Sequence, residues 1–259
     1  MQATDPPHSP LIAPPVGPNL GLQETLVQAL QTWGLALRGG FNAHADDALP
    51  PLPDGAAPAT VLLVGNAGPG MWQAFSGSKE ASDGLAHPLN RWTRRVVDAV
   101  AASAGALALY PFEAVPVWPF QRWAARCEPV HPSPLGLLIH PQYGLWHAYR
   151  AALVLGADLA LPAGPALPAV PPSTSPCQSC ASQACMHSCP VDAFGAGGYK
   201  VAACASHLAR PEGADCLQRG CLARRACPVG VPYQPSPAQN GFHMQAFLRA
   251  VGSADPALD

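Results

Sequence analysis

Eight cysteines punctuate the stretch Cys177-Gln-Ser-Cys180-Ala-Ser-Gln-Ala-Cys185-Met-His-Ser-Cys189-Pro190 and its continuation through Cys204, Cys216-Leu-Gln-Arg-Gly-Cys221 and Cys227-Pro228. Thiolates at such short spacings are soft metal ligands, and sets of four hold either zinc or iron–sulfur clusters. This pattern decides the fold of the last third of the chain. A small domain built around bound metal is expected there.

Two features favour clusters over zinc. Cys189 and Cys227 are each followed by proline, and the cysteines form two matching blocks. The blocks resemble the runs of bacterial two-cluster ferredoxins, in which the last cysteine of each run binds the other cluster. That resemblance implies one [4Fe–4S] cluster on Cys177, Cys180, Cys185 and Cys227, and another on Cys189, Cys204, Cys216 and Cys221. One cluster with structural cysteines, or zinc, stays open as an alternative.

The composition narrows the functional class. The net charge is −2, and only Lys79 and Lys200 among the 14 basic residues are lysines. Such a balance provides no extended basic surface for nucleic acid. No secretory signal and no apolar run of about 20 residues is visible, so we expect neither a membrane partner nor export. Nine cysteines without a signal indicate a reducing compartment, and we place the protein in the cytoplasm.

Prolines mark the expected domain boundaries, because the chain has 32 and they concentrate at the N-terminus, around 50–58, around 162–176 and around 228–237. The expected division is a disordered N-terminal tail (1–19), a large domain (20–165), a Pro-rich linker (166–176), the cysteine domain (177–232) and a C-terminal extension (233–259) with a helix near Gln239–Val251.

Hydrophobic periodicity predicts the elements of the large domain. Helices are expected over Leu20–Trp33, Pro88–Ala102 and Phe120–Cys127, and buried strands over Thr60–Gly65 and Ala106–Tyr110. Residues 39–58 are expected to form a loop. Strands Leu135–His140 and Leu145–Leu155 are expected to pair as a hairpin around the turn Pro141–Gly144. The alternation of helices and strands predicts an α/β or α+β sandwich.

Arg150 is a charged residue within an apolar strand. Strict alternation places it on one face with Ala152 and Val154. A charge inside a strand requires a partner, either an internal carboxylate or a bound anionic or polar ligand. Cys127 lies far from the other cysteines and is expected to be a buried apolar residue.

The stretch Gly136-Leu-Leu-Ile-His-Pro-Gln-Tyr-Gly-Leu-Trp-His-Ala-Tyr-Arg150 resembles the signature hairpin of the CblC family of cobalamin-processing proteins. The resemblance covers roughly residues 20–165. It implies an α+β fold of the flavin-reductase (nitroreductase-like) type. It also implies binding of cobalamin with its nucleotide base displaced, and removal of the upper ligand by reductive decyanation or by dealkylation to a thiol.

The same resemblance implies roles for individual residues. The backbone of the apolar run would lie under the corrin, Tyr143 and Trp146 would shape the hairpin, and Arg150 would meet the thiol co-substrate. The run itself consists of Gly136, Leu137, Leu138, Ile139 and His140. A D-x-H-x-x-G motif for a cobalt-binding histidine is absent from the sequence, in keeping with base-off binding.

The order of the whole chain is similar to that of epoxyqueuosine reductases and reductive dehalogenases, which join a related cobalamin domain to two [4Fe–4S] clusters. In epoxyqueuosine reductase a catalytic Asp lies three residues before Pro-Val, and Glu113 occupies that place before Pro116-Val117. This implies that Glu113 donates a proton; the alternative is a surface carboxylate. The helical-repeat region of that tRNA enzyme is missing.

The resulting hypothesis is a cobalamin reductase that removes the upper ligand of base-off cobalamin, with electrons delivered through two clusters from an external low-potential donor (flavodoxin, ferredoxin or a reductase). One alternative keeps cobalamin as a recycled cofactor for reduction of an organic epoxide or halide. Another is an electron-transfer ferredoxin without catalysis of its own. Flavin in place of cobalamin is the alternative that the shared fold leaves open.

Overall fold

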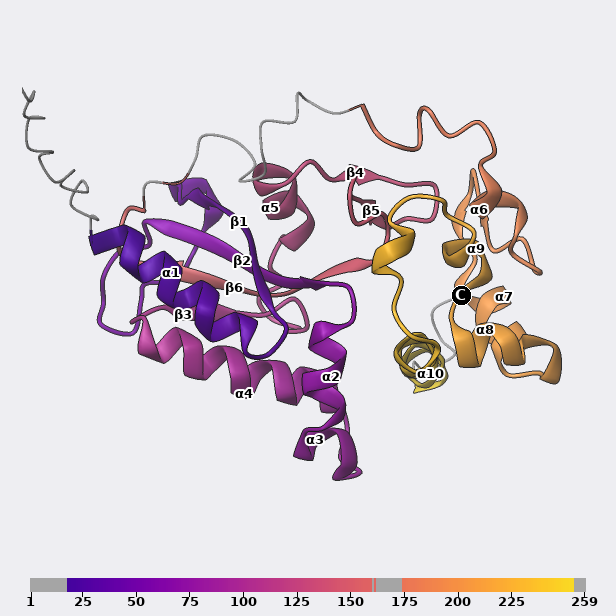
Figure 1. Cartoon of the computed structure of the whole chain (residues 1–259), viewed down its shortest axis with the longest axis horizontal. Coiled ribbons are helices and arrows are strands. Elements are labelled where there is room, and N and C mark those ends of the chain that lie inside the picture. Colours follow the sequence, from indigo (N-terminus) through magenta and orange to yellow (C-terminus); the bar gives the residue numbers. More distant parts are fainter. Residues whose placement is uncertain (1–17, 160, 162–173, 254–259) are drawn as a thin grey trace, which may run out of the picture.

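The computed structural model describes residues 18–159, 161 and 174–253. The predicted tail (1–19) and the linker (166–176) lie mostly outside the described residues. Two parts follow one another along the chain. A sheet flanked by helices comes first, and a smaller part made largely of short helices carries the eight cysteines (Figure 1).

A four-stranded antiparallel sheet forms the centre of the first part, in the order β1-β2-β6-β3. Its strands are β1 (Ala36–Asn42), β2 (Thr60–Ala67), β3 (Leu107–Leu109) and β6 (His147–Leu155). The middle strand β2 is buried along almost its whole length, because helices cover both faces of the sheet. Such a strand reads as a continuous apolar run, as Thr60–Gly65 does.

Side chains of β2 alternate between two cores. Leu62 and Val64 pack with the helices α1 (Pro18–Gln31), α2 (Gly70–Ser76) and α4 (Pro88–Ser103), around the fully buried Trp92. Val61 and Leu63 pack on the opposite face with α5 (Phe120–Cys127), around Trp123. The sheet therefore lies between two helical layers.

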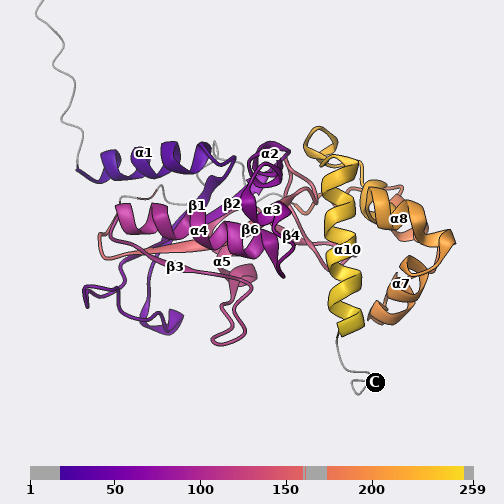
Figure 2. The same cartoon turned by 90° about the horizontal axis from the view of Figure 1, so that it is seen from below.

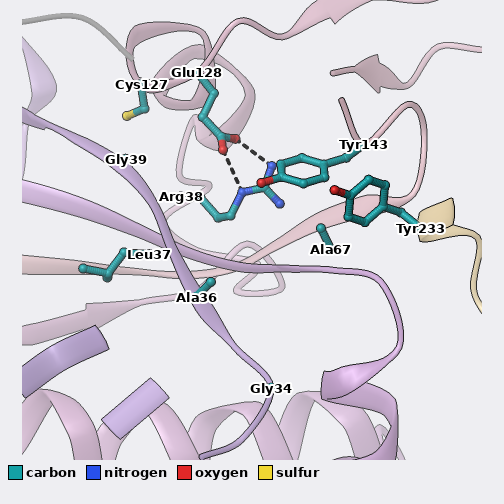
Figure 3. Close-up of a pocket in the computed structure, with 10 residues that line it drawn as sticks. All are labelled: Gly34, Ala36, Leu37, Arg38, Gly39, Ala67, Cys127, Glu128, Tyr143 and Tyr233. Atoms are coloured by element: carbon teal, nitrogen blue, oxygen red, sulfur yellow. Dashed lines mark hydrogen bonds and ion pairs between the residues drawn. The ribbon is translucent and has the colours of Figure 1, made fainter. Parts of the chain in front are cut away.

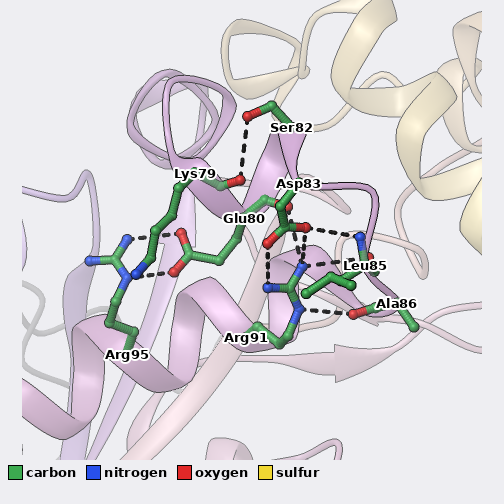
Figure 4. A network of polar contacts seen from close by, with 8 residues as sticks. All are labelled: Lys79, Glu80, Ser82, Asp83, Leu85, Ala86, Arg91 and Arg95. Carbon is green, nitrogen blue, oxygen red and sulfur yellow. Dashed lines mark hydrogen bonds and ion pairs between the residues drawn. The ribbon is translucent and has the colours of Figure 1, made fainter.

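A polar network holds the short helix α3 (Lys79–Ser82) against α4 (Figure 4). Arg95 Nε and Nη2 donate to the two oxygens of the buried Glu80 at 2.5 and 3.0 Å, and Arg91 pairs with Asp83 at 2.7 Å. The hydrogen bond from Arg95 lowers the pKa of Glu80 to about 2. Glu80 is therefore a paired buried charge, as expected for a carboxylate removed from water.

The predicted hairpin is not formed. Strand Leu135–His140 is reduced to β5 (Leu138–Ile139), which pairs with β4 (His131–Pro132), while β6 pairs with β2 and β3. Only a bridge between His140 and Gly144 joins the two sides of the turn. The long strand β6 enters the central sheet because β2 and β3 offer it partners on both edges.

The second part consists of short elements: α6 (Ala184–His187), β7 (Phe194–Gly195), β8 (Gly198–Tyr199), α7 (Val201–Leu208), α8 (Ala214–Arg219), α9 (Leu222–Arg225) and α10 (Pro237–Ser253). Three 3-10 turns complete the set: η1 (Ala45–Asp47) in the first part, and η2 (Pro211–Gly213) and η3 (Val231–Tyr233) in the second. Figure 2 shows α10 lying between the sheet part and helices α7 and α8. Phe242 of α10 contacts the rings of Trp72 and Phe75 at 5.4 and 5.3 Å between centroids, so the two parts are packed together.

The α+β class is confirmed, and helices α1, α4, α5 and α10 and strands β2, β3 and β6 lie where periodicity predicts them, to within a few residues. The prediction of a loop over 39–58 is wrong at its start, since β1 runs to Asn42. None of the helices in the described part of the chain has the length and apolar character needed to span a bilayer.

Candidate redox site at the junction of the two parts

The pKa shifts of the thiols indicate which cysteines influence one another. Burial raises the pKa of Cys185, and the thiolates of Cys227, Cys177 and Cys180 raise it further. Burial likewise raises the pKa of Cys204, with Cys189 and Cys216 acting in the same direction, and that of Cys221, with Cys216 and Cys204. We name these the first thiol group (Cys177, Cys180, Cys185, Cys227) and the second thiol group (Cys189, Cys204, Cys216, Cys221).

The thiols of a group are neighbours, but they do not converge on one point. Within the described residues, no set of three His, Cys, Asp or Glu side chains lies close enough to hold a single metal ion. Eight thiolates are donors of the kind that iron–sulfur clusters require, and they also suit zinc.

Cysteines of both thiol groups pack on the stretch that the sequence singled out, residues 135–150, here named the hairpin segment. Leu135, Ile139 and Leu145 are 5%, 1% and 3% exposed, and they form one apolar cluster with the buried Cys227. Cys177, Cys185, Cys189 and Cys221 pack against this cluster. The thiols and the hairpin segment therefore share a core without intervening secondary structure.

Two glycines allow the backbones to approach. A Cβ on Gly144 would lie 2.0 Å from the Val229 carbonyl oxygen, and one on Gly230 would lie 2.3 Å from the Tyr143 carbonyl. Both residues have positive φ, +57° and +74°, which glycine adopts without strain. The turn of the hairpin segment and the chain after Cys227 are thus in backbone contact.

His140 lies inside the turn and is 1% exposed. Its Nδ1 accepts the backbone N–H groups of Gln142 (3.0 Å) and Tyr143 (3.3 Å), so the proton of the neutral ring is on Nε2. Burial, followed by the charge of Arg38, lowers its pKa to about 4; the same causes lower the pKa of His147 to about 3. Both rings are neutral at neutral pH, and Nε2 of His140 is enclosed without a protein partner in the described structure.

Trp146 is 2% exposed and forms the contact between the hairpin segment and α9. The Arg224 guanidinium carbon lies 4.6 Å from the centroid of its ring, and Arg224 Nε donates to the Leu145 carbonyl at 3.1 Å. A second bond runs from Nη2 to the same oxygen. Burial lowers the pKa of Arg224 to about 10, which leaves the group charged at neutral pH.

Arg150 lies in a β-bulge of β6. Val64 of β2 pairs with Ala151, whereas the next residue, Gly65, pairs with Tyr149, so Arg150 is the extra residue. Bulges redirect a side chain. Arg150 consequently reaches α4, where Nη2 donates to Thr93 Oγ1 at 3.1 Å. The prediction that it shares a face with Ala152 and Val154 is wrong, because those residues pack in the α5 core.

The partner of Arg150 is a hydroxyl and not a carboxylate. Its Nε is buried without an acceptor, and burial lowers the pKa of the group to about 10. Arg150 also influences His243 of α10. Burial lowers the pKa of His243 to about 4, and the positive charges of Arg150 and Arg224 act in the same direction. Of the two partners expected from sequence, the internal carboxylate is not found among the described residues, and a bound polar ligand remains.

A pocket of about 310 Å³ opens beside Tyr143, between β1, the end of α5 and Tyr233 (Figure 3). Arg38 and Glu128 form a buried two-pronged ion pair there, at 2.7 and 3.0 Å, and the Tyr149 hydroxyl donates to Glu128 at 2.5 Å. The Arg38 guanidinium carbon lies 4.6 Å from the centroid of the Tyr143 ring. The pocket therefore combines aromatic faces with a fixed cation, next to the hairpin segment.

Cys127 is buried, as predicted, and it lines this pocket. Burial and the neighbouring Glu128 raise the pKa of its thiol to about 12, which makes it unreactive at neutral pH.

Glu113 lies in the loop after β3. Arg94 Nη2 donates to its Oε1 at 2.8 Å, and Trp118 Nε1 donates to Oε2 at 3.3 Å. The adjacent tip is exposed, with Val115 and Val117 at 89% and 79%. The Glu113 carboxylate is thus held at the surface by Arg94 of α4. Arg94 directly follows Thr93, the partner of Arg150, in the sequence.

The remaining predicted cobalamin contacts differ in accessibility. Gly136 has φ +73° with open space around its Cα, and Leu137 is 42% exposed. Leu138 is half-buried, and its carbonyl bonds to His147 Nε2 at 3.1 Å. Gly136 and Leu137 are therefore the exposed part of the run, whereas Ile139 and His140 face inward.

The sequence prediction missed Arg38, Glu128, Tyr233, Arg224 and His243. Each is a polar residue brought in from a different element, and no spacing rule connects them. The available signal was indirect: Arg38 lies in a strand whose second half was predicted to be a loop, and Arg224 lies between two predicted ligand cysteines.

Comparisons with known proteins give no match to any protein-family model and no match among curated sequences. Solved structures do match. One is a selenomethionine-labelled epoxyqueuosine reductase, 14% identical over 86% of this chain and 71% of that chain, with a TM-score of 0.49. Another is CblC, a B12-trafficking protein of C. elegans, 13% identical over 92% and 97% of the two chains, with a TM-score of 0.45. At such identities and scores the likeness concerns the outline of the fold, and the function depends on the residues of this chain.

Proposed function

We propose that this chain is an iron–sulfur cobalamin reductase. It binds cobalamin with the base displaced, beside the hairpin segment, and removes the upper ligand reductively with electrons passed through two [4Fe–4S] clusters. One observation carries the proposal: cysteines of both thiol groups, with Cys227 at the centre, share a buried core with Leu135, Ile139 and Leu145. A ligand on the hairpin segment would therefore lie next to the electron source, as reductive cofactor chemistry requires.

In this proposal the first thiol group holds one cluster and the second thiol group the other, in a nitroreductase-like domain followed by a ferredoxin-like domain. The clusters supply electrons one at a time at low potential. The chain's own residues hold them beside the hairpin segment, through the close backbone approach at Gly144 and Gly230. The electrons come from an external donor of the flavodoxin, ferredoxin or reductase class.

The corrin would lie over the backbone of Gly136, Leu137 and Leu138, with Ile139, His140, Tyr143 and Trp146 giving the segment its shape. The neutral rings of His140 and His147 add no charge under the macrocycle. We assign the displaced base to the pocket beside Tyr143, because an aromatic ring suits the faces of Tyr143 and Tyr233 and the guanidinium of Arg38.

The proposed reactions balance as follows. Decyanation consumes one electron from the external donor, the cobalt–carbon bond breaks, and cyanide leaves with the bonding pair. In dealkylation a thiolate co-substrate takes the alkyl group, and the bonding pair stays on the cobalt. Arg150 would position the thiol co-substrate through its unsatisfied Nε. Neither reaction takes a proton from Glu113, whose carboxylate accepts a hydrogen bond from Arg94.

Anaerobic purification tests the proposal. Protein with iron and sulfide in the ratio of two four-iron clusters should change the spectrum of added cyanocobalamin and release cyanide when a reductant is supplied. The variant Cys227→Ser should lose the first cluster and the reaction together. Protein that carries both clusters but leaves the cobalamin spectrum unchanged would refute the assignment.

The loop of Glu113 favours a second candidate, in which cobalamin is a recycled cofactor and an epoxide or halide is the substrate. A carboxylate that can exchange partners near Arg150 would protonate such a product. Stoichiometry separates the two candidates: processing consumes free cobalamin mole for mole, whereas a cofactor turns over many substrates. Glu113→Gln should affect only the second activity.

A further inference from the structure

α9 carries two neighbouring arginines whose charges are treated differently by the fold. Arg225 donates Nε to the Gly220 carbonyl at 3.1 Å and Nη2 to Asp215, so a carboxylate compensates its charge. Arg224 donates only to the Leu145 carbonyl and lies over the Trp146 ring. No carboxylate compensates Arg224 among the described residues.

Arg224 lies between cysteines of the two thiol groups, so its positive charge acts on both groups. The residue lies three positions after Cys221 of the second thiol group and three before Cys227 of the first. Its hydrogen-bond partner, Leu145, packs in the same buried cluster as Cys227. A fixed cation thus lies beside both thiol groups, in a half-buried setting where water screens it less than at the surface.

We propose that Arg224 is a positioning residue that sets the reduction potentials of the clusters assigned to the two thiol groups, by holding an uncompensated positive charge beside them. The inference rests on the proposed function. When the external donor passes one electron to a cluster, the cluster becomes more negative by one charge and no bond is made or broken. A nearby cation stabilises that reduced state, so its removal lowers the potential.

The guanidinium fork also fixes the hairpin segment relative to the charge. Two donors to one carbonyl, with the plane of the group over an indole ring, hold Arg224 in one orientation. The potential and the position of Trp146 therefore depend on the same side chain. A lysine at position 224 would keep the positive charge but would lack the planar guanidinium group with its two donors to Leu145.

The test is a potentiometric titration of the full chain, purified anaerobically, with cluster reduction followed by electron paramagnetic resonance and without added cobalamin. R224Q should lower the equilibrium constant for reduction of at least one cluster about tenfold, which is about 59 mV for a one-electron couple. R224K should stay close to the parent. R224M, which keeps the stem that covers Trp146, replaces R224Q if that variant does not hold its clusters.

The matched control is the double variant D215N/R225Q, which removes a compensated pair from the same helix region and should leave both potentials unchanged. Unchanged potentials in cluster-bearing R224Q or R224M would overturn the inference, as would an equal shift in R224K. Parent protein without iron and sulfide would instead refute the proposed function, so the two failures are distinguishable.

Discussion

Arg150 Nη2 donates to Thr93 Oγ1 at 3.1 Å, and this bond joins the bulge of β6 to the buried face of α4. Thr93→Val keeps the shape of the side chain but removes the acceptor of a buried charged donor. We expect a loss of about 1–3 kcal/mol of unfolding free energy. Thiol-dependent dealkylation should fall roughly tenfold to a hundredfold, because Arg150 is no longer held in place.

Decyanation needs no thiol, so it should change less in the same variant. Thr93→Ser retains the hydroxyl and serves as the control. Equal losses of both activities in Thr93→Val would show that the contact is structural only.

Glu128→Gln tests the ion pair in the pocket. The side chains of Arg38 and Glu128 are 4% and 8% exposed, and removal of one buried partner leaves an uncompensated charge. The expected cost is about 3–5 kcal/mol of unfolding free energy, measured by urea denaturation. Asp83→Asn is the control: its pair with Arg91 is 29–33% exposed, so water screens it and the loss should be much smaller. Similar costs for the two variants would contradict this account.

The neutral state of His140 predicts a pH dependence of stability. Its pKa is about 4 in the folded protein and ordinary, 6.5, in the unfolded chain. Above pH 6.5 His140 is deprotonated in both the folded and the unfolded state, so it adds no pH dependence to the free energy of unfolding. Between pH 6.5 and 4 the unfolded state alone binds the proton, so stability falls by up to about 1.4 kcal/mol per pH unit from this group.

Thermal unfolding at pH 7.5 and pH 5.0 measures the effect. His140→Asn keeps an acceptor for the N–H groups of Gln142 and Tyr143 but does not titrate. Its Tm should therefore drop less between the two pH values than that of the parent. Iron content after each scan controls for acid loss of metal, and parallel drops in both proteins would exclude His140 as the cause.

Gly144→Ala tests the contact between the two parts. Its Cβ would lie 2.0 Å from the Val229 carbonyl oxygen, and backbone must move to make room. We expect clusters to be retained but electron transfer to bound cobalamin to be slowed, together with a lower Tm. Gly105→Ala is the matched control: φ is also positive, at +59°, yet nothing lies within 4 Å of the added methyl. The control variant should lose only the free energy of unfolding that a non-glycine residue costs at positive φ, about 1–2 kcal/mol. Normal electron transfer in Gly144→Ala would argue against a role for this backbone contact.

The periodicity of apolar residues was sufficient to predict a helix wherever that helix buries one apolar face. Helix Phe120–Cys127 lies at its predicted bounds, since its aromatic and small residues recur at helical spacing and the flanking segments break the pattern. The division of the cysteines into two ligand sets stays a prediction from the ferredoxin resemblance. Thiols that influence one another's pKa, such as Cys185 with Cys177, Cys180 and Cys227, belong to the same predicted set.

Other features required the tertiary structure. The sequence alone determined the α+β class and marked the stretch 136–150 as the centre of interest. Tertiary structure decided that β6 pairs within the central sheet, because strand pairing depends on which edges are free. It also decided that a bulge turns Arg150 toward Thr93, that Arg38 meets Glu128 across 90 residues of chain, and that no carboxylate of the described residues pairs with Arg224. Such contacts depend on distances between elements, and periodicity within one element carries no information about them.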